Sequence, residues 1–155
     1  FYRVVEGQVC VQVGDTEIIT RQIDGQYPSY EKIIPPRFTT RATLDTQQLL
    51  RAAKTASLFA RDSANIVRFR LDAHSLTVSA NSPQTGEGAV QIDAKVEGDG
   101  GDIAFNSRFL LELLAVFPGE EVAFEMTGAL NPGAFKSPKD PAFLHIIMPV
   151  RVQGN

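Results

Sequence analysis

The same order of predicted elements occurs twice in the second part of this chain of 155 residues. In each copy a strand leads into a helix, and three extended segments follow the helix. A repeat of roughly 60 residues with this order predicts two similar halves related by approximate twofold symmetry, each with a helix on one face of a mainly antiparallel sheet. A chance recurrence of α+β order is the alternative explanation.

The first copy begins with a predicted strand over residues 37–44. Asp45 is a good N-cap, and Gln48 follows three residues later, so a helix is expected to run to about Ala60. Three extended segments come next, and in each of them apolar and polar residues alternate with a period of two: residues 66–72, 75–81 and 88–98. Strands with one apolar face predict that both helices cover the same side of the sheets and that water covers the other.

The second copy follows a Gly- and Asp-rich turn at residues 98–101. A short strand leads to Asn106 or Ser107 as the cap of a helix from Arg108 to Phe117, which Pro118 and Gly119 end. Three extended segments are predicted after this helix: residues 120–127, 132–137 and 142–152.

The part of the chain before the repeat has a different character. Gly14 and Asp15 predict the turn of a β-hairpin. Residues 24–37 hold three prolines and show no helical period, so they are interpreted as a linker with a domain boundary near residue 35. The chain starts at Phe1 in a strand-like segment without an initiator Met, and we therefore expect it to be a fragment.

The residues that most often carry catalysis or metal binding form no recognisable motif here. Cys10 is the only cysteine, which excludes an internal disulfide and a cysteine-built zinc site and favours a reducing compartment such as the cytoplasm. His74 and His145 have no partner at a ligand spacing. No apolar segment approaches the roughly 20 residues that span a bilayer. We expect no catalytic residue, no metal, no cofactor and no membrane contact.

The charges are unevenly placed on the first predicted helix. Although the formal net charge of the chain is −3, the polar residues on one face of this helix are basic or neutral: Gln47, Arg51, Lys54 and Arg61. Leu49, Leu50, Ala53 and Ala56 define the buried side. Taken alone, such a face is more often an ordinary solvated helix face. The alternative is contact with phosphates, which would be independent of sequence.

Four sequence segments together resemble the bacterial sliding clamp, the beta subunit of DNA polymerase III: residues 25–35 (GQYPSYEKIIP), 67–71 with 76–88 (VRFRL, LTVSANSPQTGEG), 103–114 (IAFNSRFLLELL) and 146–152 (IIMPVRV). The resemblance covers nearly the whole chain but only the last part of the family protein. It implies that residues 1–34 are the closing strands of the middle domain plus the linker, and that residues 35–155 are the C-terminal third domain. The implied fold is the α+β DNA-clamp fold, with two βαβββ units in each domain, helices lining a central hole and sheets outside.

The resemblance implies a non-catalytic function. Two full-length subunits would close head to tail into a ring around duplex DNA, without reading its sequence, and hold the DNA polymerase III catalytic subunit on its template. The residues implied to face DNA are Arg51, Lys54, Arg61 and Arg108, and those implied at the ring-closing contact are Leu58 and Phe59. This chain has no first domain for that contact, so we expect Leu58 to be exposed.

A second implied site is a groove that docks short peptides of partner proteins: the polymerase, the clamp loader, other polymerases and repair proteins. The matching positions are Pro28, Lys32, Ile33, Asn106, Phe109, Leu130, Pro132, Ile146, Met148, Pro149 and Val150. Lys32 stands where an arginine is frequent, and Ala64 where an aromatic residue can stand. The opposite wall of the groove belongs to strands that precede this chain. The alternative hypothesis is a stand-alone peptide-binding α+β module without a DNA role.

Overall fold

The computed structural model describes residues 2–27, 29–84 and 86–152. Residues up to Tyr30 form one unit, and residues from Glu31 onward form a second unit. Unit 1 is an antiparallel sheet of β1 (Tyr2–Val5), β2 (Gln8–Val13) and β3 (Thr16–Arg21). Val13 pairs with Thr16 across the turn at Gly14 and Asp15, which confirms the predicted hairpin.

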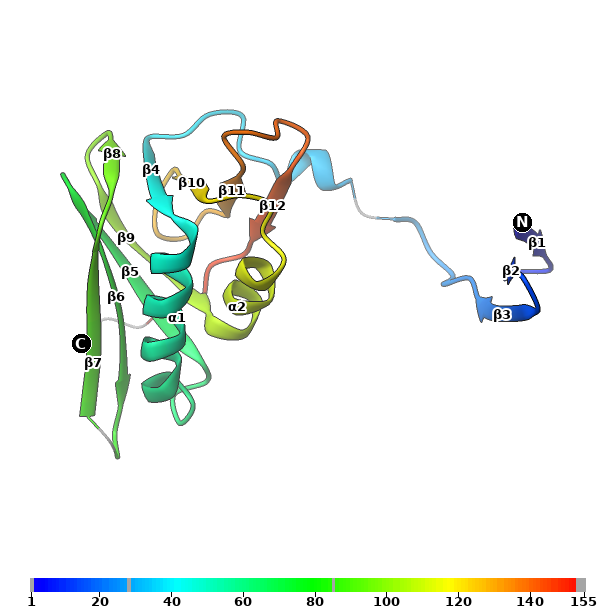
Figure 1. Cartoon of the computed structure of the whole chain (residues 1–155), viewed down its shortest axis with the longest axis horizontal. Helices are drawn as coiled ribbons and strands as arrows, with labels where there is room; N and C mark the ends of the chain where they lie inside the picture. Colours follow the sequence, from blue (N-terminus) through cyan, green and yellow to red (C-terminus); the bar gives the residue numbers. More distant parts are fainter. Residues whose placement is uncertain (1, 28, 85, 153–155) are drawn as a thin grey trace. The chain divides into compact units, whose positions relative to one another are not determined.

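Unit 2 contains two antiparallel sheets and two helices (Figure 1). A short 3-10 turn, η1 (Tyr30–Lys32), stands at its start. The five-stranded sheet has the order β12-β11-β10-β4-β8, with β4 Thr40–Asp45, β8 Lys95–Glu97, β10 Glu121–Met126, β11 Gly133–Lys136 and β12 Leu144–Ile147. The four-stranded sheet has the order β7-β6-β5-β9, with β5 Ile66–Asp72, β6 Ser75–Ser82, β7 Gly86–Asp93 and β9 Gly101–Asn106.

The two copies of the repeat exchange their first strands. β4 opens the first copy but pairs with β10 of the second, where Ala42 lies opposite Phe124. β9 opens the second copy but pairs with β5 of the first, where Ile103 lies opposite Phe69. Each sheet therefore contains strands of both copies in matching order, as an approximate twofold axis requires. The predicted doubled α+β fold is confirmed.

The helices form where their caps predict. In α1 (Thr46–Ala60), the Asp45 carboxylate accepts a hydrogen bond from the Gln48 N–H at 2.7 Å. In α2 (Ser107–Ala115), the Asn106 side chain accepts one from the Arg108 N–H at 3.0 Å. α1 packs on β4, β5, β6 and β7, α2 packs on β9 and β12, and the two helices contact each other. Both helices thus lie together on one side of the sheets, as expected (Figure 1).

Aromatic rings fill the centre of the core between the sheets and helices. The rings of Phe69, Phe105 and Phe124 meet edge to face, with centroids 5.5–5.8 Å apart, and all three side chains are fully buried. Gly133 lies against this cluster. A Cβ at that position would stand 2.6 Å from Cζ of Phe105, so the close packing of the rings requires glycine there.

Three predicted boundaries were wrong. The extended segment 88–98 is not one strand, because β7 pairs with β6 only as far as Asp93 and residues 95–97 pair with β4 as β8. The second helix ends at Ala115 rather than at Phe117, since Pro118 disfavours helical backbone at the residue before it.

The last strand also ends earlier than predicted, at Ile147. Beyond it, the Val150 N–H donates to the Ala104 carbonyl, so the terminal segment runs along β9 instead of extending β12. Leu50, which was predicted on the buried side of the first helix, is only half-buried.

Candidate functional site

The solvent-facing side of α1 carries a row of cations. Arg51, Lys54 and Arg61 are all exposed, and Leu49, Ala53 and Ala56 on the opposite side are fully buried. Arg108, at the start of α2, is exposed too. Within residues 2–27, 29–84 and 86–152, none of these four cations forms an ion pair. Their charges are therefore available to an anionic partner.

Leu58 belongs to the same face of α1. It follows Lys54 by four residues and precedes Arg61 by three, which places it in line with the cations. Its side chain is 56% exposed, as expected. Phe59 differs from Leu58: it is half-buried, and its ring lies directly over Gly88 of β7, where any side chain would collide with it. β7 is an edge strand of the four-stranded sheet, so the turn of α1 that carries Leu58 and Phe59 packs beside a strand edge.

An open groove with a volume of about 490 Å³ lies between α2 and β12. Three residues implied by the resemblance line it: Phe109, Ile146 and Met148. Phe109 and Met148 are 56% and 59% exposed, so this apolar surface is uncovered in the chain. Five further residues complete the lining: Glu112, Leu113, Val116, His145 and Ile147.

The other residues predicted for the peptide groove lie outside this cavity. Lys32 ends the η1 turn and is exposed, and Ile33 is 42% exposed beside it. The side chain of Asn106 caps α2 by accepting a hydrogen bond from the Arg108 N–H. Leu130 and Pro132 lie in the connection between β10 and β11, and Pro149 and Val150 in the segment along β9. Pro28 lies outside the described residues. Ala64 is exposed in the loop after α1, with a positive φ of 55°.

The additional groove residues on α2 carried a signal in the sequence. Phe109, Glu112, Leu113 and Val116 are spaced three, four and seven residues apart, which places them on one helical face. Val116 is 76% exposed just after the helix ends. His145 and Ile147 carried no such signal, because both faces of their segment are apolar or nearly so.

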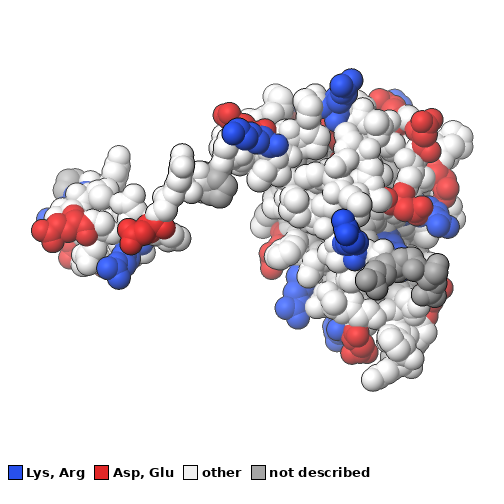
Figure 2. Space-filling view, turned by 180° about the vertical axis from the view of Figure 1, so that it is seen from behind, with Lys and Arg blue, Asp and Glu red and all other residues white. Residues whose placement is uncertain are grey.

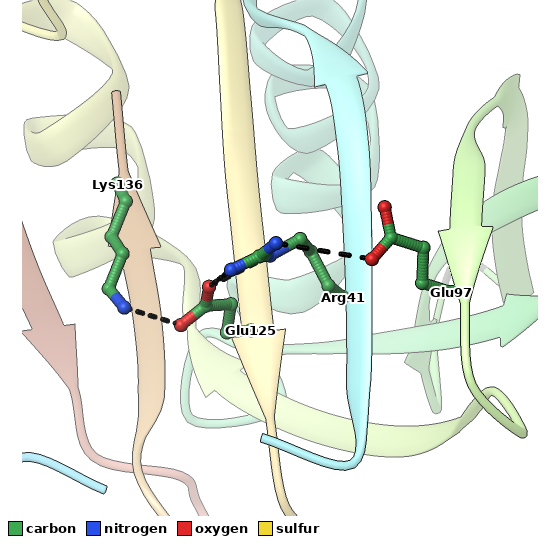
Figure 3. A network of polar contacts seen from close by, with 4 residues as sticks. All are labelled: Arg41, Glu97, Glu125 and Lys136. Carbon is green, nitrogen blue, oxygen red and sulfur yellow. Dashed lines mark hydrogen bonds and ion pairs between the residues drawn. The ribbon is translucent and has the colours of Figure 1, made fainter. Parts of the chain in front are cut away.

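A network of charged side chains crosses the five-stranded sheet on the face opposite the helices (Figure 3). Arg41 Nη2 lies 2.6 Å from Oε1 of Glu125, and Lys136 Nζ lies 2.6 Å from Oε2 of the same carboxylate. Arg41 Nη1 also lies 3.9 Å from Oε2 of Glu97. We call Glu97, Arg41, Glu125 and Lys136 the Glu125 network. The sequence carries no local signal for this network, because its members come from four different strands.

Glu125 is a buried residue, only 5% exposed. Burial by itself raises the pKa of Glu125, but hydrogen bonds and charges from Lys136 and Arg41 outweigh it, so that the pKa lies below its ordinary value. Glu125 is therefore a buried anion held by two cations near neutral pH.

Other chemistry-bearing residues are placed as follows. The thiol of Cys10, buried in unit 1, donates a hydrogen bond to the Glu17 carboxylate at 2.8 Å, and this contact raises the pKa of the thiol. A raised pKa disfavours the nucleophilic thiolate. In the described part of the chain no three His, Cys, Asp or Glu side chains gather as a metal site, and none of its helices is long and apolar enough to cross a membrane.

Charges on the face of unit 2 shown in Figure 2 are of both signs. Blue and red side chains are scattered there and do not form a continuous patch of one sign. On the outside of β5 and β9, Arg70 and Asp102 form an ion pair, with Nε and Oδ1 2.9 Å apart. These mixed charges contrast with the exposed face of α1, where the cations have no acidic partner among the described residues.

Comparison with known proteins places this arrangement in one family. Residues 31–151 match the family model described as DNA polymerase III beta subunit, C-terminal domain. The beta sliding clamp of Bacillus subtilis is 32% identical over 151 residues, which cover 96% of this chain and 40% of that protein. The Synechocystis beta sliding clamp is 27% identical over 96% of this chain and 39% of its own length.

Solved structures agree with the sequence comparison. The crystal structure of the Bacillus subtilis sliding clamp superposes with a TM-score of 0.88 at 32% identity, over 98% of this chain and 41% of that one. The Thermotoga maritima beta subunit gives a TM-score of 0.87 at 24% identity, over 98% of this chain and 41% of that one. This chain spans about 40% of the length of the curated relatives it matches. It belongs to the family of DNA polymerase III beta subunits, the sliding clamps, and corresponds to their C-terminal part.

Proposed function

We propose that this chain is the DNA-facing and partner-docking C-terminal part of a sliding clamp that surrounds duplex DNA as a head-to-tail dimer. The observation that carries this proposal is the exposed face of α1. Arg51, Lys54 and Arg61 share it without an ion pair to any described residue, and α2 lies beside it on the same side of the sheets. Such a surface suits the inner wall of a ring.

The number of cations fits a protein that slides. A ring that holds a polymerase by topology needs attraction to phosphates but no reading of bases, and dense contacts would slow its movement. A few solvated cations on each helix meet this demand. The clamp has no catalytic role in this proposal; it acts by keeping the DNA polymerase III catalytic subunit on its template.

The groove between α2 and β12 is proposed as part of the site that docks peptides of the polymerase, the clamp loader and other DNA-repair and replication proteins. Phe109 and Met148 supply exposed apolar surface, half-buried Ile146 adds to the apolar lining, and Glu112 and His145 supply polar groups. An apolar slot with a few orienting polar groups is the usual form of a peptide-docking site.

Leu58 and the edge of β7 are proposed as the ring-closing contact. An exposed leucine near a strand edge is a surface that another subunit can cover, because the strand offers backbone groups and the leucine offers apolar area. Phe59 supports this surface from below by packing on Gly88.

The DNA role is tested by changing both Arg51 and Lys54 to Ala in the full-length protein. The affinity for duplex DNA should fall, and the slope of log affinity against log salt should become shallower by about 0.9 for each phosphate that is no longer neutralised. The matched control changes Arg68 and Arg70, on the outer face of β5, to Ala. An equal loss of affinity in both variants, or an unchanged slope, contradicts the assignment.

The docking role is tested with a fluorescent peptide copied from the clamp-binding segment of the same organism's polymerase III catalytic subunit. Met148→Ala should weaken its binding to the full-length protein, whereas Leu144→Ala, at an exposed position outside the groove on the same segment, should not. Peptide binding that depends on Met148, combined with no DNA binding at all, would favour the stand-alone peptide-binding module.

A further inference from the structure

Five residues form one transverse row across the outer face of the five-stranded sheet. Arg41 pairs with Glu97 on one side and with Glu125 on the other, and Glu125 pairs with Ala134. Ala134 in turn pairs with Ile146 of the proposed docking groove. Directly opposed residues of neighbouring strands point to the same face. Three members of the Glu125 network, Glu97, Arg41 and Glu125, therefore share a row with Ile146 of the groove.

The chain that enters unit 2 lies over this row. Ile34, Pro35, Arg37 and Phe38 line a small cavity together with Glu125, Met126, Thr127, Ala134 and Lys136. The cover explains why Glu125 and Ala134 are only 5% and 3% exposed although they lie on the outer face of the sheet. We call residues 33–39 the entry segment.

Two kinds of contact hold the entry segment in place. The guanidinium of Arg41 lies 4.1 Å from the ring centroid of Phe38, a cation–π contact. Both the N–H and the hydroxyl of Thr39 donate to the carbonyl of Met126, at 3.0 and 3.2 Å. The first contact depends on the orientation of the guanidinium, which Glu125 fixes by accepting hydrogen bonds from Nε and Nη2.

The entry segment begins with Ile33, a proposed groove residue. Ile33 precedes Ile34, which shares the small cavity with Ala134, and Ala134 is the direct neighbour of Ile146. Lys32 is one residue further back. The orientation of Lys32 and Ile33 relative to β12 therefore depends on how firmly the entry segment is held on the sheet.

We propose that Glu125 is a positioning residue for partner docking: by holding Arg41 beneath Phe38, it fixes the entry segment so that Lys32 and Ile33 form the linker side of the peptide groove. The proposal rests on the proposed docking function. If the entry segment were loosely held, it would have to be ordered each time a peptide binds, and this ordering would reduce the affinity. By holding the segment in advance, the buried anion would act beyond the sheet itself.

The test is a double-mutant cycle on the full-length protein, read out as affinity for the fluorescent polymerase peptide. Glu125→Gln keeps the shape of the side chain and removes its charge, and we expect it to weaken peptide binding about 3- to 10-fold. Phe38→Leu leaves the buried charges paired and removes the ring above Arg41, so it should weaken binding in the same direction even if Glu125→Gln folds poorly. Asp102→Asn, which breaks the exposed pair with Arg70, is the control and should leave the affinity unchanged.

The decisive comparison combines Glu125→Gln with Ile33→Ala and, separately, with Met148→Ala. A positioning role predicts that the double variant of Glu125→Gln and Ile33→Ala loses less affinity than the product of the two separate fold-losses. For Glu125→Gln with Met148→Ala, the two fold-losses in affinity should multiply. If Glu125→Gln acted only through a general loss of stability, the fold-losses in affinity would multiply in both pairs, and this result would overturn the inference. Full affinity in both Glu125→Gln and Phe38→Leu would overturn it as well. If Ile33→Ala and Met148→Ala both bind normally, the docking function itself fails together with this inference.

Discussion

Arg41 donates two hydrogen bonds to a single oxygen of Glu125, from Nε at 2.9 Å and from Nη2 at 2.6 Å. The second oxygen of the carboxylate accepts from Lys136 at 2.6 Å. Both oxygens of this buried anion are thus bound to cations that come from the two neighbouring strands, β4 and β11. Strands far apart in the sequence are joined by one side chain of β10.

This arrangement predicts how stability depends on pH. The pKa of Glu125 is lower in the folded chain than in the unfolded chain, where it has its ordinary value of about 4.5. The stabilisation is therefore fully present above that value and is lost as the pH falls through the folded-state pKa. Arg41 and Lys136 are the cations that face this carboxylate.

The expected result is that wild type exceeds Glu125→Gln in free energy of unfolding by about 1–3 kcal/mol at pH 7, because the variant gives up charge-assisted hydrogen bonds at a buried site. The difference should shrink below about pH 4. Urea unfolding at a series of pH values measures it. A difference that stays constant down to about pH 2.5 would show that the carboxylate charge is not the cause.

Gly133 is predicted to tolerate no side chain. Gly133→Ala places a Cβ 2.6 Å from the Phe105 ring and 2.9 Å from the Phe124 ring, so the rings must shift in a closely packed core. We expect a loss of about 1–3 kcal/mol in the free energy of unfolding. Phe105→Leu in the same chain should relieve part of the strain, and the double variant should lose less than the sum of the two single ones. Strict additivity would place the strain elsewhere.

Leu58 and Phe59 are predicted to differ, although they are adjacent. Leu58→Ser changes an exposed side chain and should alter the free energy of unfolding by less than about 0.5 kcal/mol. In the full-length protein it should weaken the dimer, which sedimentation velocity at decreasing concentrations measures. Phe59→Ser removes a ring that packs on β7 and should lower the stability of the single subunit as well. Destabilisation by Leu58→Ser in the single subunit would contradict its exposed position.

The cap of α1 gives a further prediction. Asp45→Ala removes the acceptor for the Gln48 N–H at the start of the helix that carries the cations. The expected loss is about 1 kcal/mol in the free energy of unfolding, measured by urea titration followed by circular dichroism. Asp62→Ala, beyond the end of the same helix, is the matched control. If both variants lose the same amount, general charge effects and not the cap are responsible.

Local features of the sequence predicted the elements and their doubling. Asp45 and Asn106 start helices where expected, because an N-cap acts on backbone groups two or three residues away. The exposed positions of Arg51 and Lys54 also followed from helical spacing, which is a property of a single element. The resemblance to the family also rests on short sequence segments, and the residue pattern of each segment can be read without its tertiary neighbours.

Tertiary structure decided the contacts that join distant strands. The exchange of β4 and β9 between the two copies depends on which strand edges are free after folding, and alternation along a strand says nothing about its neighbour. The same holds for the break at Ala94, where pairing of residues 95–97 with β4 divides a segment whose alternating pattern is continuous.

The sequence by itself determined which side of each helix and strand is apolar, where the helices start, and that two equivalent units follow a linker. Only the tertiary structure made Glu125 a buried anion between Arg41 and Lys136 and put the entry segment on top of it. The physical reason is range: capping and periodicity act within a few residues, whereas the environment of a charge is set by every strand that folds against it.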